Sequence, residues 1–455
     1  MRRATVSGSM KKDIPESQIF GTMSIAKILL KLAPPVMLAQ LIQALYNIVD
    51  SLFVASYQEA GLTALSILYP AQLLMIALAV GTGVGVNTVM AARCGEGDEA
   101  EADAFAGTGT PLAVILWLFF AAVCWVVMPW YARSCTDSPD VIRGVVVYGR
   151  IVCTLSLPLF LESMWSKILQ ARGDMKTPMN AQILGAAVNI ALDPLLIFGL
   201  CGLPEMGLAG AAAATVAGQS VAAAVVMKKG FKPCRSRRDI PRHAAEIFRL
   251  GVPNILMQSA YTFYIYGLNI ILSGFSDQAV TALGIYYKWM TFFFIPLGTM
   301  QTCIVPVISY NFAARNMERC RKTVRDSIAF GMALIATGTL CFTLMPETML
   351  RVFTADAEVV AIGRIAFPFI GISFIGMVTS LIFPVFFQAV GSGLISSMLT
   401  VVRTVILFVP LGYAFSRFGL ERFWFTFPVT EALTSLLGYC LYRRFFRHPF
   451  MKAKP

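Results

Sequence analysis

Residues 31–69 read KLAPPVMLAQLIQALYNIVDSLFVASYQEAGLTALSILY, and residues 249–287 read RLGVPNILMQSAYTFYIYGLNIILSGFSDQAVTALGIYY. Aligned end to end without a gap, the two stretches share Leu32, Pro35, Leu38, Gln40, Tyr46, Thr63, Ala64, Leu65, Ile67 and Tyr69. The same register, continued along the chain, aligns Gln170-Ala171 with Gln388-Ala389. Because polar positions recur as well as apolar ones, the pattern predicts an internal duplication rather than chance similarity between hydrophobic helices.

The composition indicates a membrane protein. Of the 455 residues, 57% are hydrophobic and 14% are charged, and the mean hydropathy is +0.70. A soluble chain is about 45–50% apolar and about 25% charged, and apolar runs of about 18 or more residues indicate membrane helices. We expect an all-α polytopic protein with six helices in each half, at residues 24–54, 62–92, 104–131, 141–170, 177–200, 206–228, 244–274, 280–313, 322–345, 357–390, 394–416 and 423–446.

The positions of Lys and Arg predict the orientation. They gather in the N-terminal tail, in KKGFKPCRSRRDIPR (228–242), after the eighth helix and at the C-terminus. Cytoplasmic loops are enriched in these residues, so we expect a multi-pass protein of the plasma (inner) membrane with both termini in the cytoplasm. The same clustering accounts for the net charge of +12 without a nucleic-acid partner. The expected organisation is a tail (1–23), a first lobe (24–228), a basic linker (229–243), a second lobe (244–447) and a tail (448–455).

The first helix carries a polar stripe that ends in an acid. Gln40, Gln43, Asn47 and Asp50 follow one another at spacings of three, four and three residues, which places them on one helix face. A charged residue near the bilayer centre costs about 2.5–3.5 kcal/mol on insertion scales and is a functional candidate for that reason. The stripe is expected to face a cavity or another helix, although a purely structural hydrogen-bonding role for Asp50 stays open.

The fifth and sixth helices offer partners for Asp50. Asn189 and Asp193 are four residues apart in VNIALDPLLIFG, and Thr215 and Gln219 are four apart after the small-residue run GLAGAAAA. Small residues allow helices to pack closely in a membrane. We expect Asp50 and Asp193 to share a pocket and to titrate as a coupled pair, with a structural role as the alternative.

The second half does not repeat the acids, since Asp50 aligns with Leu268 and Asp193 falls near Val409. Its polar residues are candidates for substrate contacts or, equally, for interfacial and core packing: Gln258, Tyr261, Tyr264, Tyr266, Asn269, Lys288 and Arg403. Glu162 and Glu431 are either cavity acids or partners of nearby bases. Lys167 is expected to snorkel to the cytoplasmic edge of the membrane.

These motifs resemble those of a known family. PxxLAQLIQALYNIVDSLFVA, TALS, VNIALDPLLIFG, GLAGAAAAT and PVISYNFAARN are similar to the multidrug and toxic compound extrusion (MATE) family, and to its DinF-like branch more than to its NorM-like branch. The resemblance covers residues 24–447. The helix-seven and helix-ten acids of NorM-like members are missing, since Tyr261 stands at the former position and residues 368–391 hold no acid.

The resemblance implies a V-shaped pair of six-helix bundles that works by alternating access. It implies export of small, often cationic amphipathic organic compounds by a monomer in the lipid bilayer, driven by inward H⁺ or Na⁺ and without a cofactor. The coupling residues of that branch correspond to Asp50, Asn189, Asp193 and Thr215, and the cavity would include Gln40, Gln43, Asn47 and Gln219. We expect H⁺ as the coupling ion, with Na⁺ at the same four residues as the variant.

Two other functions are weighed against this one. A flippase for lipid-linked saccharides shares the architecture and requires a strongly basic cavity. Lys288 and Arg403 favour this function, whereas the acidic residues of the first lobe argue against it. A membrane enzyme would require catalytic groups within the spans. The sequence has two histidines and ten scattered cysteines without metal-like spacing, so we expect no enzymatic activity.

Overall fold

The computed structural model describes residues 19–57, 59–136, 138–234 and 238–447. Within these ranges the chain is helical and contains no β-strand. The first half consists of α1 (Ile19–Thr22), α2 (Ile25–Tyr57), α3 (Glu59–Glu96), α4 (Glu99–Cys135), α5 (Pro139–Thr154), α6 (Leu157–Ala171), α7 (Lys176–Ile197), η2 (Leu200–Gly202) and α8 (Leu208–Gly230). The expected tails lie outside the described residues except for residues 19–23, where α1 forms.

The second half repeats this order. Its elements are α9 (Ile240–Ser273), α10 (Asp277–Ala313), α11 (Met317–Leu344), α12 (Pro346–Arg351), α13 (Ala357–Ala389), α14 (Gly393–Val401), η3 (Val402–Phe408), α15 (Val409–Ser416), α16 (Leu420–Phe423) and α17 (Thr426–Arg447). Helix α8 ends later than expected and α9 begins earlier, so the linker between them comprises residues 231–239.

Two predicted helices are interrupted. The helix expected at 141–170 breaks into α5 and α6, which are bent by 44°, because Pro158 has no N–H to bond to the preceding turn. The helix expected at 394–416 contains the π-helical segment η3 ahead of Pro410. Such wide turns occur often at functional sites.

Ten of the described helices are long and apolar enough to cross a membrane, and the bent α5–α6 pair makes an eleventh. The last predicted span, α17, is 22 residues long but does not meet this criterion because Glu431 and a basic end interrupt its apolar sequence. It packs along α13, where a Cβ on Gly438 would lie 2.7 Å from Phe383. Its place in the second half is that of a sixth long helix.

Polar caps start the helices at the membrane surface. The side chains of Asp98, Ser276, Asn316 and Asp356 accept hydrogen bonds from backbone N–H groups in the first turns of α4, α10, α11 and α13. These N–H groups have no partner within their own helix. The caps therefore set where the chain leaves each loop.

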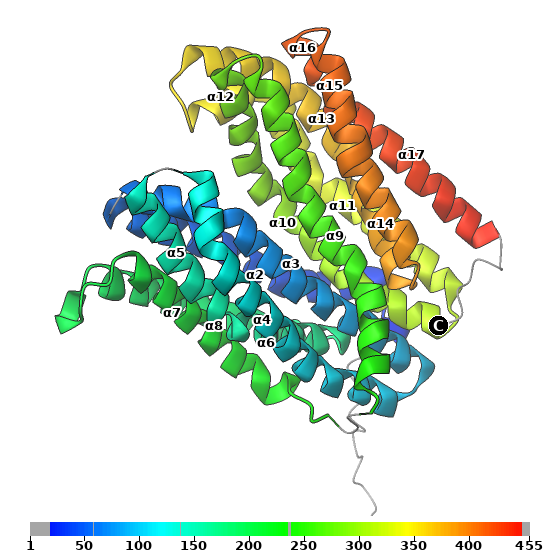
Figure 1. Ribbon diagram of the computed structural model, residues 1–455. Coiled ribbons are helices and arrows are strands. Elements are labelled where there is room, and N and C mark those ends of the chain that lie inside the picture. The colour runs from blue at the N-terminus through cyan, green and yellow to red at the C-terminus, as the bar shows by residue number, and fades with distance from the viewer. Residues whose placement is uncertain (1–18, 58, 137, 235–237, 448–455) are drawn as a thin grey trace, which may run out of the picture.

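The helices form two bundles, each around an apolar core. The start of α2, from Ile25 to Val36, packs into the core of the second bundle, and Ile247 and Leu250 of α9 pack into that of the first. The two bundles lie close together near the linker and diverge toward the opposite end (Figure 1). Glycines on α3 make the close approach: a Cβ on Gly85 would lie 2.2 Å from the Ile247 carbonyl oxygen of α9, and one on Gly95 would lie 2.1 Å from the Tyr310 carbonyl oxygen of α10. We call this contact the glycine seam (Gly81, Gly85 and Gly95 against α9 and α10).

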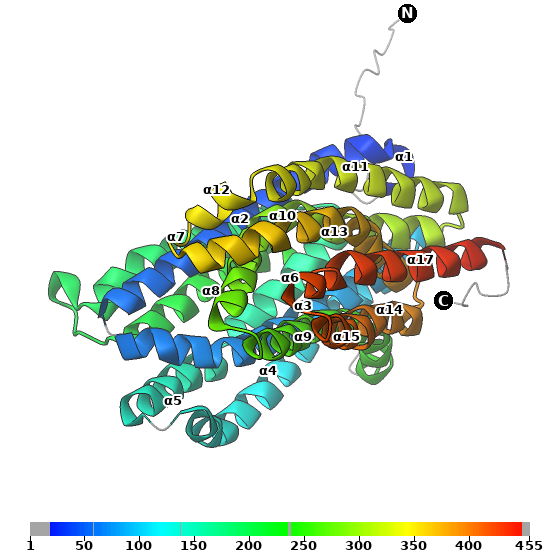
Figure 2. The same cartoon turned by 90° about the horizontal axis from the view of Figure 1, so that it is seen from above.

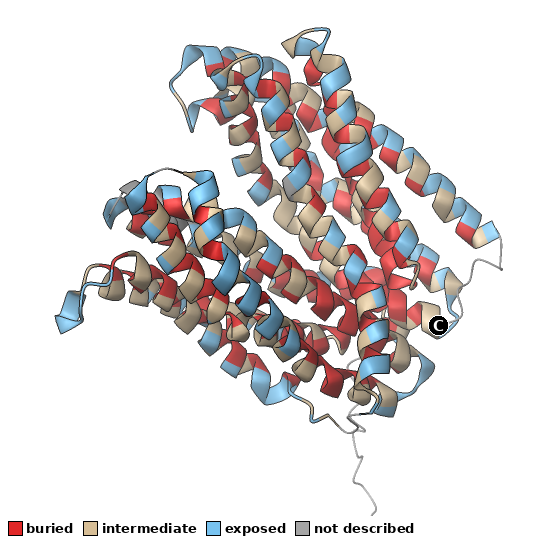
Figure 3. Cartoon of the chain, in the orientation of Figure 1, coloured by how far each residue is buried: buried red, intermediate tan, exposed pale blue. Residues whose placement is uncertain are grey.

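Buried and exposed residues follow the two bundles. Buried residues concentrate where helices face one another, and exposed apolar residues cover the outer surfaces of both bundles (Figure 3). Helix α2 packs against α7 of the first bundle and against α10 of the second, and α2 and α10 lie side by side in the view from above (Figure 2). Because a lipid-facing surface has no need of polar side chains, this distribution agrees with a chain that spans a membrane.

Candidate functional site

Three residues of the predicted stripe on α2 face a common space. Gln43, Asn47 and Asp50 line a cavity of about 860 Å³ together with Thr215 and Gln219 of α8. We call this space the N-lobe cavity. The predicted stripe and its predicted partners on the sixth membrane helix therefore meet.

Gln40 is the exception in the stripe. Its amide oxygen lies opposite Gly298 of α10, where a Cβ would approach it to 3.2 Å, and it does not line the N-lobe cavity. Because α2 packs between the two bundles, one face of this helix contacts both lobes at different heights. Of the two surroundings expected for the stripe, a cavity or another helix, Gln40 therefore has the second.

Asp50 ends the stripe in a buried position. Its side chain is 9% exposed, and its Oδ1 atom has no hydrogen-bond partner among the described groups. Its counterpart in the second half, Leu268, is fully buried in the apolar core. A buried carboxylate without a partner is costly unless it takes up a proton or a cation.

Asn189 and Asp193 lie on α7, the helix that packs against α2. The Asn189 amide donates a hydrogen bond of 3.4 Å to Oδ1 of Asp193, which is 0% exposed, and Oδ2 of Asp193 has no partner among the described groups. Asp193 itself does not line the N-lobe cavity.

Small residues bring α7 against α8. A Cβ on Gly185 would lie 2.7 Å from the Gly218 carbonyl oxygen, and one on Gly218 would lie 3.0 Å from Cβ of Asn189. This close packing, expected from the run of small residues, sets Asn189 beside Thr215. The Thr215 hydroxyl donates to the Ala211 carbonyl at 3.0 Å, which leaves its oxygen available as an acceptor.

A narrow polar pocket of about 80 Å³ adjoins the N-lobe cavity and shares Gln43, Thr215 and Gln219 with it. We call it the polar pocket. It also contains Glu162, whose Oε1 accepts a 2.7 Å hydrogen bond from Ser166. Glu162, whose role the sequence left open, is therefore a third acid near Asp50 and Asp193, and it shares the polar pocket with Asn189 and Thr215. Carboxylate, amide and hydroxyl oxygens together suit a proton or a hard cation.

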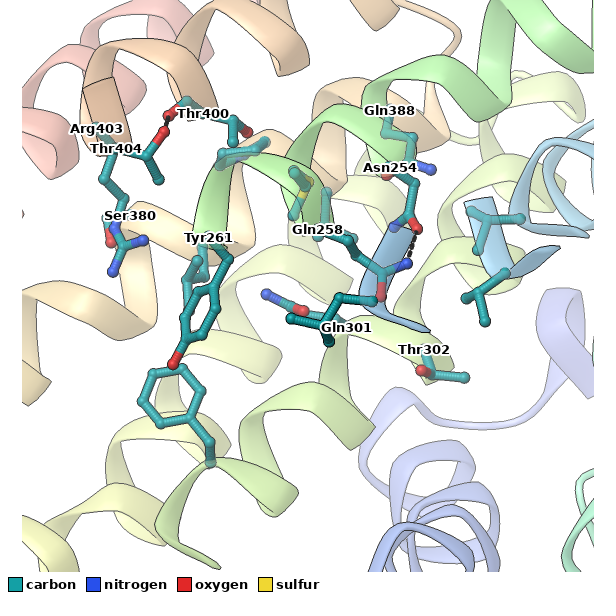
Figure 4. Close-up of a pocket in the computed structure, with 18 of the residues that line it drawn as sticks. Asn254, Gln258, Tyr261, Gln301, Thr302, Ser380, Gln388, Thr400, Arg403 and Thr404 are labelled. Carbon is teal, nitrogen blue, oxygen red and sulfur yellow. Dashed lines mark hydrogen bonds between the residues drawn. The ribbon is translucent and has the colours of Figure 1, made fainter. Parts of the chain in front are cut away.

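A second large space lies between the bundles on the C-lobe side. This cleft cavity, of about 580 Å³, is lined by Gln258, Tyr261, Tyr264 and Arg403, as the sequence suggested. Figure 4 shows Asn254 and Gln258 joined by a 3.0 Å hydrogen bond on α9, with Gln301, Thr302 and Gln388 around them. Tyr264 also packs on Phe408, so cavity lining and core packing apply together.

Arg403 is neutralised inside the C-lobe. Its guanidinium Nε bonds both carboxylate oxygens of Glu431 at 3.1 and 3.2 Å, and the two side chains are 7% and 1% exposed. Ser380 also donates to the Glu431 carboxylate. Glu431 is therefore a partner of a base and not a free acid, which resolves the choice that the sequence left open.

Lys288 lies elsewhere than the other C-lobe candidates. It lines the N-lobe cavity with Asp50, and its Nζ is 5.1 Å from the ring centre of Phe353. The prediction grouped it with Arg403, but helix α10 extends far enough that its outer part borders the first lobe. Its exposed ammonium group stands near the open end of the cavity.

Several lining residues were not singled out by the sequence as cavity residues. Lys167, for which the sequence suggested an edge position only, lines the cleft cavity together with Gln170, Gln388 and Asn87. The signal for the two glutamines was present, because they occupy the same position in the two halves. Two equivalent residues lie opposite each other when the repeats meet at a common axis.

Comparisons with known proteins agree with this architecture. The MatE family model matches residues 35–195 and again residues 253–414. The starts of the two matches, Pro35 and Pro253, are paired in the ungapped alignment of the halves, which confirms the predicted duplication. Two solved structures have the same fold at 22% identity over 95% of this chain and 98% of theirs. One is an outward-facing multidrug resistance MATE family transporter, with a TM-score of 0.88, and the other is a transporter of the MOP superfamily from Pyrococcus furiosus, with a TM-score of 0.87.

Curated relatives match parts of the chain. The probable multidrug resistance protein NorM of Thermotoga maritima is 26% identical over 240 residues, 50% of each chain. The multidrug export protein MepA of Staphylococcus aureus is 25% identical over 298 residues, which are 63% of this chain and 64% of the relative. The matched region thus spans about half to two thirds of these proteins. On the strength of the family model, which covers most of both halves, this polytopic membrane protein belongs to the MatE family.

Proposed function

We propose that the protein is an ion-coupled antiporter that exports amphipathic organic compounds, with H⁺ as the coupling ion and the coupling site in the first lobe. The observation that carries the proposal is Asp50, a buried carboxylate with an unpaired oxygen beside the N-lobe cavity. The names of the MepA and NorM relatives, which refer to multidrug export and resistance, support export as the direction.

The coupling step rests on the neighbourhood of Asp50. Lys288 is the one basic residue among those that line the N-lobe cavity with Asp50, and among the described residues no ion pair involves Asp50 or Asp193. A proton that neutralises these acids removes their mutual repulsion and their desolvation cost. Binding can shift the balance of two conformations only if the ion prefers one of them. We propose that the deprotonated acids favour the drug-loaded, outward-facing state, and that protons from outside neutralise the acids, disfavour this state and release the drug.

Alternating access follows from the arrangement of the bundles. With both termini in the cytoplasm, as the basic loops favour, the glycine seam closes the cytoplasmic end and the open end faces outward. We propose that the bundles rock about the closed end, and that the paired prolines Pro34-Pro35 let the lower part of α2 adjust. A proline pair removes two backbone donors from the helix and loosens it locally.

The branch of the family is part of the proposal. Asp50, Asn189, Asp193 and Thr215 keep the pattern of DinF-like members. On the C-lobe side the acid that lies beside the cavity wall, Glu431, is held by Arg403. The first lobe therefore offers the better coupling site, with the monomer as the working unit.

A flippase for lipid-linked saccharides remains the alternative of the same architecture. That function requires a cluster of basic groups for a pyrophosphate. Of the two basic candidates, Arg403 is ion-paired and Lys288 stands in the other cavity. The charges needed for a pyrophosphate are thus not brought together, and export of organic compounds fits better.

Liposomes with independently imposed H⁺ and Na⁺ gradients test the proposal. We expect the wild-type protein to move a fluorescent dye such as ethidium uphill under an H⁺ gradient, and the Asp50→Asn variant to lose this movement. Asp140→Asn, which removes an exposed carboxylate from the first turn of α5, is the matched control and should transport normally. Uphill transport by Asp50→Asn under either gradient would overturn the coupling role.

A further inference from the structure

The cleft cavity differs in charge from the N-lobe cavity. None of the residues that line it is an Asp or Glu, and its two charged side chains are Lys167 and Arg403. Because Glu431 neutralises Arg403, Lys167 is the charged residue of this lining that has no ion-pair partner among the described residues.

Lys167 is held by amides rather than by an acid. Its Nζ donates a 3.0 Å hydrogen bond to Oε1 of Gln170, and the amide of Asn87 donates to its backbone carbonyl at 2.9 Å. Among the described residues no carboxylate forms an ion pair with it. The acid on α6, Glu162, is five residues from Lys167, lines the polar pocket and accepts a hydrogen bond from Ser166.

The duplication shows that the fold does not require a lysine here. In the ungapped alignment of the two halves, Lys167 corresponds to Val385, and Gln170 corresponds to Gln388. All four residues line the cleft cavity. The same position thus accepts a small apolar side chain in the second half, while the first half bears a charge that costs free energy in a membrane. A role in binding explains that cost better than packing does.

Unsatisfied amide groups accompany the charge. Gln388 is 0% exposed, and neither its Nε2 nor its Oε1 has a hydrogen-bond partner among the described groups. Figure 4 shows its side chain beside Asn254 at the cavity wall. Oδ1 of Asn87 is likewise unpaired. Buried polar groups are normally satisfied, so these amides await a polar ligand.

The cavity lining contains both polar and apolar groups. Lys167, Gln170 and Gln388 lie near the C-terminal ends of α6 and α13, whereas Tyr261, Met290, Phe294 and Met377 line the cavity farther along α9, α10 and α13, together with the polar Ser380 and the ion-paired Arg403. Along α13 the eleven steps from Met377 to Gln388 correspond to about 16 Å at 1.5 Å per residue. A molecule with a polar head and an apolar body of about that length fits this distribution.

We propose that the cleft cavity binds an amphipathic organic anion, whose carboxylate or phosphate is held by Lys167 and accepts a hydrogen bond from the unpaired Nε2 group of Gln388. This site is distinct from the N-lobe cavity, where Asp50 favours H⁺ or a cation. The proposal rests on the proposed export function in one respect, that the anion would be a substrate. Binding of the anion itself needs no ion gradient and can be measured independently of transport.

Binding of two matched probes to protein in phosphatidylcholine nanodiscs tests the site. The probes are dansyl amides of an eleven-carbon chain, one ending in a carboxylate and the other in a trimethylammonium group. We expect the wild-type protein to prefer the carboxylate probe. Lys167→Gln should weaken this probe by about tenfold, as loss of a charge-assisted contact in a desolvated site does, and Lys167→Arg should retain most of the affinity.

The control is Lys228→Gln, which removes a charge from the exposed end of α8 outside the cavity and should leave both probes unaffected. Equal affinity of Lys167→Gln and wild type for the carboxylate probe, or a wild-type preference for the ammonium probe, would overturn the proposal. Adding phosphatidylglycerol to the nanodiscs separates two sources of the anion, since a lipid occupant predicts competition and a soluble amphiphile predicts none. Failure here leaves the Asp50 liposome result untouched, so the two proposals fall separately.

Discussion

Replacing Gly85 by alanine should open the closed end of the molecule. The added Cβ would lie 2.2 Å from the carbonyl oxygen of Ile247 and 3.0 Å from the backbone nitrogen of Gly251. Both atoms belong to the backbone of α9 and cannot rotate away. To reach an ordinary contact, α3 and α9 must separate by about 1 Å, and overpacking of this kind costs about 1–3 kcal/mol.

The same energy biases the conformational equilibrium. The clash exists only while the glycine seam is closed, so the alanine variant shifts the population toward the state open at this end by about 5–150-fold. Cys94, buried beside Gly95 in the seam, serves as the reporter. We expect its rate of modification by a water-soluble maleimide, followed by peptide mass spectrometry, to rise in Gly85→Ala.

Gly284→Ala is the matched control, because a Cβ at this helical glycine meets no atom within 4 Å. Its Cys94 should react as in the wild type, and the exposed Cys135 should react equally in all variants. If Cys94 were no more reactive in Gly85→Ala than in Gly284→Ala, the glycine seam would not be the element that holds this end closed.

Two further predictions concern stability, measured by thermal melting in detergent. Glu431→Gln leaves Arg403 buried without its counter-ion and should lower the free energy of unfolding by about 3–5 kcal/mol. The double variant Arg403→Met, Glu431→Leu should regain most of the lost stability. A Glu431→Gln protein as stable as the wild type would refute a stabilising role of this ion pair. Asp174, in the loop before α7, is partly buried, which raises its pKa, but hydrogen bonds from Thr177 and the ammonium of Lys229 outweigh burial and hold the pKa of this carboxyl below its usual value. The ionised Asp174 therefore stabilises the fold above the unfolded pKa of about 3.9, and this stabilisation is lost as the pH falls through the lower folded value. Asp174→Asn should lower the free energy of unfolding at pH 7 by about 0.5–2 kcal/mol, as loss of a helix cap does, and should match the wild type at acid pH. A difference that does not change with pH would contradict the assignment.

Much of the architecture was predictable because membrane helices are long and apolar and because the repeat has no gaps over its clearest stretch. Aligning residues 31–69 with residues 249–287 revealed both halves, and the family model confirms them. The breaks at Pro158 and at η3 were missed, since many prolines lie within unbroken helices of this chain, among them Pro70 and Pro253. A proline removes one hydrogen bond, and packing decides whether the helix continues.

The site was predictable where residues share a helix face and not where two faces compete. Gln43, Asn47 and Asp50 meet Thr215 as the spacing indicated. Gln40 has the same spacing and yet lies against Gly298 of α10. Helical periodicity shows which residues share a face, but not which helix packs against that face at each position along the axis. Pairing across helices, such as that of Arg403 with Glu431, depends on distances that a single sequence does not contain.

Proton release on ligand binding tests the central claim most directly. Addition of ethidium to the detergent-solubilised protein in weakly buffered solution should release protons from the wild type, because the ligand and the proton compete for the same conformational equilibrium. The account predicts that Asp50→Asn still binds the dye, measured by its fluorescence anisotropy, but releases fewer protons. Proton release from Asp50→Asn equal to that of the wild type would contradict the assignment of Asp50 as the coupling residue.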